Sequence, residues 1–90
     1  MEELLQVLYF SAPWCGPCKM FGPAFDEVVA KFGDEIVVSK INVDEKQEVA
    51  ADYAIRSIPT VIMLKGKNEL FRHTGVMPKN HLEDLIKIKK

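Results

Sequence analysis

The chain has 90 residues, 48% of them hydrophobic, and its formal net charge is −1 at pH 7. These values fit one small globular domain spanning residues 1–90 and exclude an intrinsically disordered chain. The absence of long runs of like charge argues against nucleic acid or a membrane surface as a partner. Met1-Glu2-Glu3 shows no signal-peptide pattern, and no segment reaches the roughly 18 apolar residues of a membrane span, so we expect a cytoplasmic protein.

The first half of the chain predicts a strand, a helix and a second strand. Residues 4–11 are almost entirely apolar, which is typical of a central strand covered on both faces. Residues 20–32 carry an apolar stripe with helical spacing, and Gly33 is expected to end that helix. Residues 36–43 are rich in β-branched side chains, so the three elements predict a right-handed βαβ unit with parallel strands.

The second half predicts a short helix, a hairpin and a final helix. Asp44 begins a capping-box pattern for a helix that continues to about Ala54. Residues 60–65 and 69–73 read as two strands joined by a glycine-containing turn. Pro78 is placed to open the last helix. The predicted order of elements is therefore β-α-β-α-β-β-α.

The segment Trp14-Cys15-Gly16-Pro17-Cys18-Lys19 holds both cysteines and the only tryptophan. In a reducing compartment, a close cysteine pair is more often catalytic or metal-binding than structural. Two intervening residues at a helix start bring both thiols into one turn, where they can form a disulfide. Cys15 is expected at or just before the first helical turn, where free N–H groups and the helix dipole stabilise a thiolate. Cys18 is expected to be more buried and protonated when reduced.

Thiolate formation explains only part of the reactivity that such a pair needs. Lowering a thiol pKa from about 8.5 to about 7 raises the thiolate fraction about fifteenfold at neutral pH. The lower basicity then costs a factor of roughly five in nucleophilicity. A surface that orients the target disulfide is therefore expected, and Ile58-Pro59-Thr60 is the candidate. A cis Pro59 would leave the backbone of Ile58 free to pair with an extended substrate, whereas an ordinary trans proline would only end a loop.

Several motifs, taken together, resemble the thioredoxin family: Trp14 to Lys19, Pro23, Lys40, Ile58-Pro59-Thr60 and Gly75. The resemblance covers about residues 7–87 and implies a thioredoxin-like α/β fold. It implies a protein-disulfide reductase whose redox group is the Cys15–Cys18 pair itself, with no metal and no other cofactor. It also implies disulfide-containing target proteins and a thioredoxin-reductase-like electron donor as partners, and we expect a monomer.

The resemblance also implies a role for individual residues. Cys15 would attack the target disulfide, Cys18 would resolve the mixed disulfide, and Pro59 would be cis. Gly16, Pro17 and Lys19 would support the motif. The implied groove for target proteins is lined by Trp14, Ile58, Pro59, Gly75 and Val76.

Two departures from the family pattern affect the fold and the proton chemistry. Only six residues precede Val7, so we expect four strands in a mixed sheet with helices on both faces, where the family usually has five strands. Six positions before Cys15, where the family commonly has a buried acid, this chain has Tyr9, although the neighbouring lysine is kept as Lys40. A tyrosine with a pKa near 10 is a poor proton acceptor at neutral pH. Cys18 is therefore expected to lose its proton to water or through the Tyr9 hydroxyl, with simple core packing of Tyr9 as the alternative.

Lys40 has two interpretations. Without a neighbouring acid it could lower the thiol pKa slightly, or its side chain could extend into solvent.

Three other functions fit the sequence less well. A metal site would combine the cysteines with His73 and His81, but the histidine spacing exceeds the usual three to five residues. A disulfide oxidase or isomerase is disfavoured because Gly16-Pro17 adds no charge that would stabilise the thiolate. A non-catalytic adaptor is disfavoured because both cysteines are present.

Overall fold

The computed structural model describes residues 3–90, so that Met1 and Glu2 of the expected 1–90 domain lie outside the described residues. Its elements are β1 (Leu5–Ser11), α1 (Gly16–Ala30), a 3₁₀ turn (Gly33–Glu35), β2 (Ile36–Asn42), α2 (Gln47–Asp52), β3 (Thr60–Lys65), β4 (Asn68–Thr74) and α3 (Lys79–Lys89). Apart from the 3₁₀ turn, this is the predicted order of strands and helices.

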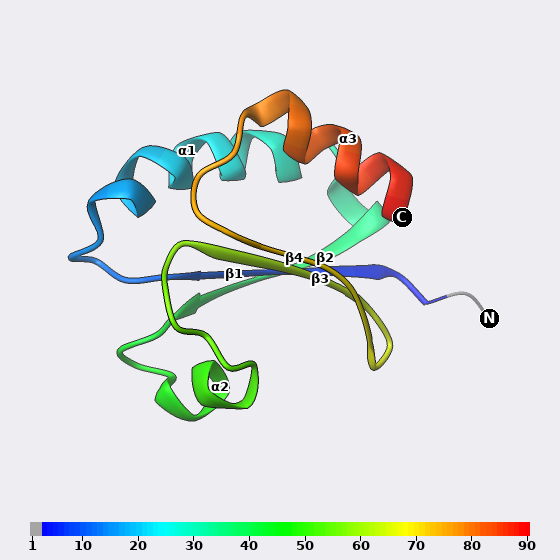
Figure 1. Cartoon of the computed structure of the whole chain (residues 1–90). Coiled ribbons are helices and arrows are strands. Elements are labelled where there is room, and N and C mark those ends of the chain that lie inside the picture. The colour runs from blue at the N-terminus through cyan, green and yellow to red at the C-terminus, as the bar shows by residue number, and fades with distance from the viewer. Residues whose placement is uncertain (1–2) are drawn as a thin grey trace.

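The four strands form one mixed sheet in the order β2-β1-β3-β4. β1 runs parallel to β2, with Tyr9 opposite Lys40, and antiparallel to β3, with Tyr9 opposite Val61. β3 and β4 form the predicted antiparallel hairpin. Helices α1 and α3 cover one face of the sheet, and α2 lies on the other (Figure 1). The expected four-stranded α/β fold is confirmed.

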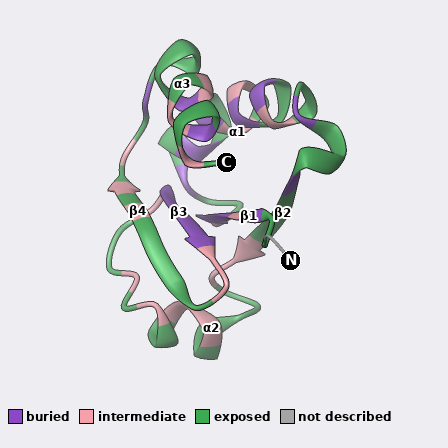
Figure 2. Ribbon diagram, turned by 90° about the vertical axis from the view of Figure 1, so that its right-hand side faces the viewer, coloured by how far each residue is buried: buried purple, intermediate pink, exposed green. Residues whose placement is uncertain are grey.

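The core has two main parts because β1 sends alternate side chains to opposite faces of the sheet, and a third small cluster holds Ala12, Cys15 and Cys18. Figure 2 shows β3 buried along most of its length and β4 largely exposed at the edge. The larger cluster, under α1 and α3, includes Val7, Tyr9, Phe21, Phe25, Val28, Leu82 and Ile86. The smaller cluster, on the α2 side, includes Leu8, Phe10, Ile62 and Leu64. A strand buried on both faces explains why residues 4–11 lack polar alternation.

Helix α1 begins where the cysteine motif predicts and ends earlier than predicted. Its first residue is Gly16, with Cys15 as the N-cap, so the helix starts ahead of the apolar stripe at residues 20–32. It ends at Ala30, and the amides of Lys31 and Phe32 then bond to the carbonyls three residues earlier. Gly33 has the left-handed φ of +50° expected of a terminating glycine, but it lies in the following 3₁₀ turn and not at the helix end. The prediction that Gly33 terminates α1 is therefore wrong.

The capping box predicted at Asp44 is also wrong. Helix α2 begins at Gln47 and has Lys46 as its N-cap, with no side-chain hydrogen bond at the cap. The Asp44 carboxylate instead accepts a hydrogen bond from Trp14. Asn42 orders this turn, because its side-chain oxygen accepts a 2.8 Å hydrogen bond from the amide of Asp44. The Asp44 side chain therefore bonds to a residue distant in the sequence, although the local pattern assigns it to the cap of α2.

Candidate active site

The two cysteines lie where the turn after β1 leads into the start of α1. The amide of Cys15 bonds to the carbonyl of Ala12 at 3.1 Å, which closes the turn after β1. Cys15 and Cys18 form a disulfide, with their Cα atoms 5.2 Å apart. The amide of Cys18 donates to the sulfur of Cys15 at 3.2 Å, so that Cys15 caps the helix through its side chain. This placement matches the expectation that Cys15 lies at the helix N-terminus.

Both sulfur-bearing residues are buried to a similar degree in this disulfide form. Cys15 is 4% exposed and Cys18 is 6% exposed. The two cysteines line different cavities, however. Cys15 lines a pocket on the side of the loop that faces α2, whereas Cys18 lines a cleft bordered by β1, β2 and α1. We refer to these as the front pocket and the rear cleft.

The front pocket has a volume of about 400 Å³. Its walls are mainly apolar, and Arg56 is the one charged residue among them. Its lining consists of Trp14, Cys15, Gly16, Pro17, Val43, Ala50, Ile55, Arg56, Ser57 and Ile58. The predicted Trp14 and Ile58 thus meet beside Cys15. Val43, Ala50 and Ile55 were missed, because only the fold brings them to the motif.

The Ile58–Pro59 peptide bond is cis. The carbonyl oxygen of Ile58 lies 3.8 Å from the sulfur of Cys15, so the segment packs directly against the disulfide. The carbonyl of Pro59 accepts a 2.8 Å hydrogen bond from the amide of Gly75, which places Gly75 next to this segment. Val76 follows it and is 52% exposed. Of the predicted groove residues, Pro59, Gly75 and Val76 do not line the front pocket.

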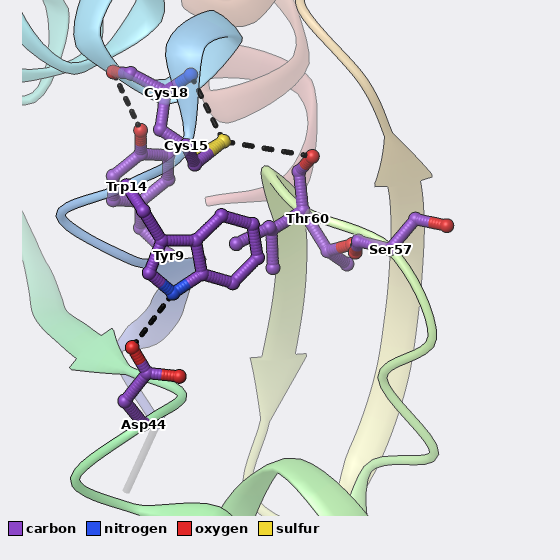
Figure 3. The surroundings of a disulfide bond; sticks show 8 residues. Tyr9, Trp14, Cys15, Cys18, Asp44, Ser57 and Thr60 are labelled. Carbon is purple, nitrogen blue, oxygen red and sulfur yellow. Dashed lines mark hydrogen bonds between the residues drawn. A yellow bond between two sulfur atoms is a disulfide. The ribbon is translucent and has the colours of Figure 1, made fainter.

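Trp14 lies at the surface with 67% of its side chain exposed. Its indole nitrogen donates to a carboxylate oxygen of Asp44 at 2.7 Å (Figure 3). Asp44 was missed as a site residue, because it lies 30 positions away in the sequence. The hydrogen bond holds a large exposed aromatic ring in one orientation at the edge of the front pocket.

The rear cleft has a volume of about 290 Å³ and a more polar lining. It is formed by Tyr9, Ser11, Ala12, Pro13, Cys18, Lys19, Gly22, Lys40 and Asn42. The predicted support residues Tyr9, Lys19 and Lys40 therefore border one cavity together with Cys18. Ser11, Gly22 and Asn42 were missed.

Tyr9 is only 2% exposed and stacks on Phe25, with ring centroids 4.6 Å apart. Its hydroxyl donates to the carbonyl oxygen of Cys18 at 3.4 Å. Burial raises the pKa of Tyr9, and the negative charge of Asp26 raises it further. Tyr9 is therefore both a core residue and a polar neighbour of the Cys18 backbone, and it stays protonated at neutral pH.

Lys40 reaches from β2 toward Asp26 on α1 and also lines the rear cleft. Its ammonium lies 2.9 and 3.1 Å from the two carboxylate oxygens of Asp26. Both side chains are about half exposed. The side chain extends to the surface while it borders the cleft that Cys18 lines, so the two interpretations of Lys40 are compatible. Asp26 is a partner that the sequence reasoning missed.

The rival metal interpretation has no support from the geometry. Among residues 3–90, no group of three or more His, Cys, Asp or Glu side chains is arranged to hold a metal ion. His73 instead stacks on Phe71, with ring centroids 6.4 Å apart. In that same part of the chain, no helix is long and apolar enough to cross a membrane.

Comparison with known proteins assigns the family. Residues 2–88 match the thioredoxin family model. The chain belongs to the thioredoxin family. The thioredoxin of Bacillus subtilis is 44% identical over 77 residues, which cover 86% of this chain and 74% of that protein. Thioredoxin 1 of Synechococcus elongatus is 40% identical over 87 residues, which cover 96% of this chain and 81% of that protein.

Solved structures agree with this assignment. The structure of thioredoxin-2 from a malaria parasite, described as a component of its protein secretion machinery, superposes with a TM-score of 0.91 at 34% identity. The match covers 98% of this chain and 85% of that one. Fasciola hepatica thioredoxin gives a TM-score of 0.88 at 30% identity, covering 99% of this chain and 84% of that one. The family and the cysteine pair make the chain a protein-disulfide oxidoreductase that acts by thiol–disulfide exchange.

Proposed function

We propose that Cys15 is the attacking thiolate and Cys18 the resolving thiol of a protein-disulfide reductase. The observation that carries this assignment is the cap of α1, where the amide of Cys18 donates to the Cys15 sulfur at 3.2 Å. That donor and the positive end of the helix dipole both favour a thiolate at position 15 after reduction. Cys15 also borders the front pocket, whereas Cys18 does not.

The reaction proceeds in two exchanges. The Cys15 thiolate attacks one sulfur of the target disulfide, forming a mixed disulfide and releasing the other target sulfur as a thiolate. Cys18 then loses its proton and attacks the Cys15 sulfur, which forms the Cys15–Cys18 disulfide and releases the second target thiolate. The target gains two electrons and this protein loses two. The 5.2 Å between the Cα atoms in the disulfide form makes the second exchange intramolecular.

Target binding is assigned to the front pocket and the cis-proline segment beside it. Trp14 and Ile58 supply apolar surface next to the Cys15 sulfur, and the Ile58 carbonyl lies 3.8 Å from that sulfur. An extended target segment could bond to the Ile58 backbone as an added strand, while one apolar target side chain enters the pocket. Gly75 and Val76 would continue the surface along the target, and the buried Pro59 would hold Ile58 in place beside it. Gly16, Pro17 and Lys19 hold the turn that presents the two thiols.

The cycle requires an external source of electrons. We propose disulfide-containing proteins as targets, a thioredoxin-reductase-like enzyme as donor, and a monomer as the working form. The cysteine pair is the redox group, so no further cofactor enters the scheme. The cytoplasm is the proposed compartment because a reducing thiol pool favours the dithiol form. Relatives from maize and spinach are named as chloroplastic M-type thioredoxins, so this placement is open to test.

Redox equilibration tests the direction of the reaction. The protein is equilibrated in a series of dithiothreitol buffers, and the fraction of Cys15–Cys18 disulfide is measured by alkylation and mass spectrometry. A reductase should have a potential near or below about −270 mV, the value typical of thioredoxin. A potential near about −120 mV, typical of a strong oxidant, would contradict the reductase assignment and favour an oxidase. The Cys18→Ser variant serves as control because it cannot form the internal disulfide.

Turnover tests the adaptor alternative. Reduction of a disulfide-bonded test protein by dithiothreitol is followed with and without catalytic amounts of this protein. Acceleration by the wild type and not by Cys15→Ser supports the enzyme. Equal rates with wild type and with no protein would favour a binding module instead.

A further inference from the structure

The two cysteines of the disulfide line different cavities, a mainly apolar front pocket and a more polar rear cleft. We propose that Cys18 exchanges its proton with water through the rear cleft, and that Asp26 is a positioning residue that sets the charge at the mouth of this cleft by holding Lys40. The proposal rests on the proposed function, since it assumes that Cys18 is the resolving thiol.

Resolution of the mixed disulfide requires a route for one proton. The Cys18 thiol must lose its proton before its sulfur attacks the Cys15 sulfur. Cys18 is 6% exposed, and on the front side a bound target would cover Cys15 and its pocket. The rear cleft remains open to solvent on the other side of the loop, and Cys18 lines it directly. Its volume of about 290 Å³ is large enough for several water molecules.

The side chains that line the cleft leave water as the proton acceptor. They offer the hydroxyls of Tyr9 and Ser11, the amide of Asn42 and the ammonium groups of Lys19 and Lys40. No carboxylate is among these lining residues in the part of the chain that the structure describes. The Tyr9 hydroxyl is no base here, because it donates to the Cys18 carbonyl and its pKa is raised by burial and by Asp26. Tyr9 therefore orders one wall of the cleft and does not take the proton.

Asp26 controls the charge at the mouth of the cleft. Its carboxylate holds the Lys40 ammonium at 2.9 and 3.1 Å, and Lys40 in turn borders the cleft. The negative charge of Asp26 also raises the pKa of Tyr9, which lines the cleft with Cys18. Lys40 favours a thiolate at Cys18 and Asp26 opposes one, so the pair together sets how readily Cys18 ionises.

The other charged and titratable groups near Cys18 come from all the elements around it. Tyr9 lies on β1 and Lys40 on β2, while Lys19 and Asp26 lie on α1. Cys15 precedes the helix, and Arg56 borders the front pocket on the far side of the loop. On the rear side only Asp26 carries a negative charge among these described residues, whereas the Asp44 carboxylate lies on the front side, bonded to Trp14. Asp26 is thus the residue whose neutralisation should change the ionisation of Cys18 most selectively.

Helix α1 also provides a matched control. Glu27, the next residue, pairs with Lys79 of α3 at 2.7 Å, and the two side chains are 57% and 55% exposed. The Asp26–Lys40 side chains are exposed to a similar degree, 53% and 50%. Neither Glu27 nor Lys79 lines the rear cleft. Glu27→Gln therefore removes the same charge from the same helix without touching the cleft.

The experiment uses the reduced protein and an aromatic disulfide reagent, dithiobis(nitrobenzoate), in a stopped-flow mixer. Attack by Cys15 releases the first coloured thiolate, and attack by Cys18 on the resulting mixed disulfide releases the second. The two phases separate the steps, because the first depends on reagent concentration and the second is intramolecular. Each phase is measured across a pH series for wild type, Asp26→Asn, Lys40→Met, Glu27→Gln and Asp26→Glu.

We expect Asp26→Asn to move the pH profile of the second phase down by about half a unit, which is about threefold in rate below the midpoint. Lys40→Met should move the profile the other way. Glu27→Gln should leave it in place, and Asp26→Glu should restore the wild-type profile. The inference is overturned if the profile stays unmoved in both Asp26→Asn and Lys40→Met, or if Glu27→Gln moves it as far. Absence of a fast first phase in the wild type would instead refute the proposed function.

A second variant tests the route itself. A Cβ atom added at Gly22 would lie 3.8 Å from the Tyr9 hydroxyl, which is an ordinary contact, so Gly22→Ala should fold normally. Gly22→Leu would place more atoms in the cleft beside Cys18. We expect Gly22→Leu to slow the second phase several-fold at every pH while the first phase is unchanged. Equal second-phase rates in Gly22→Leu and Gly22→Ala would show that the proton leaves by another path.

Discussion

The front pocket and the rear cleft are two sides of one turn, and they differ in what surrounds the sulfur. On the front, Cys15 meets apolar side chains such as Val43 and Ile55, together with an exposed tryptophan. On the rear, Cys18 lines a cleft whose walls also carry hydroxyl, amide and ammonium groups. The front suits contact with a target protein, and the rear suits exchange of a proton with water. Only two residues lie between the cysteines, yet each cysteine lines a cavity suited to a different task, target binding on the front and proton exchange on the rear.

This difference follows from the elements that build each side. The front is formed by α2 and the segments flanking it, which carry residues 43–58 past the disulfide. The rear is formed by β1, β2 and the first turns of α1, where parallel pairing places Tyr9 opposite Lys40. Changes on the two sides should therefore have separable effects on the two steps of the reaction.

The largest expected effect comes from removing the front sulfur. Cys15→Ser should lower the rate of reduction of a disulfide-bonded test protein at least about 1,000-fold, because no thiolate remains at the helix N-terminus. The rate is measured with dithiothreitol as electron source. Residual turnover above a few percent of wild type would assign the attack to a different group.

The next effect comes from placing a charge in the front pocket. Ile58→Asp would put a carboxylate beside the Cys15 sulfur, where it repels the thiolate and removes apolar contact with the target. We expect kcat/KM to fall at least about tenfold. Ile88→Asp is the control, because Ile88 is 74% exposed on α3 and does not line the pocket. An equal fall in kcat/KM in the two variants would show that the pocket has no role in binding the target.

A smaller effect is expected on the rear side at alkaline pH. Folding raises the pKa of Tyr9, so the unfolded chain ionises this phenol first as pH rises above about 10. Its contribution to stability is therefore complete below pH 10 and is lost as pH rises through the folded-state pKa. Urea denaturation across pH 9 to 12 should show a shallower loss of stability in Tyr9→Phe than in wild type.

The smallest effect concerns the orientation of Trp14. Asp44→Ala removes the acceptor of the 2.7 Å indole hydrogen bond at an exposed position. We expect kcat/KM to fall only about two- to fivefold, because an exposed hydrogen bond contributes about 0.5–1 kcal/mol. Trp14 is the only tryptophan, so its fluorescence anisotropy should fall as well. Asp52→Ala, an exposed aspartate of α2, should change neither quantity.

Much of the fold could be predicted from local pattern. Residues 60–65 match β3 at both ends, because a run of apolar side chains is bounded by a proline and a glycine turn. The start of α1 could not be found from its apolar stripe, since the first helical residues are Gly16 and Pro17 and the cap is a cysteine. Asp44 was misassigned because capping patterns are local, whereas its actual partner lies 30 residues away.

The same distinction between local pattern and long-range contact applies to the residues of the site. Local motifs were enough to predict a disulfide-forming pair at Cys15 and Cys18, and the family resemblance implied the cis bond that is observed before Pro59. The Asp26–Lys40 pair depends on how far β2 lies from α1 and on the register that sets Lys40 opposite Tyr9. Neither quantity is encoded in any short segment. The two cavities likewise arise only when distant segments come together.

Trapping the mixed disulfide tests the central claim, the division of labour between the two sulfurs, most directly. Reduced Cys18→Ser and Cys15→Ser proteins are each mixed with a disulfide-bonded test protein, quenched with acid, and analysed by peptide mass spectrometry. The account predicts a stable adduct through Cys15 in Cys18→Ser and almost none in Cys15→Ser. An adduct through Cys18 that forms as fast in Cys15→Ser would show that the rear sulfur also reaches targets, and it would contradict the account.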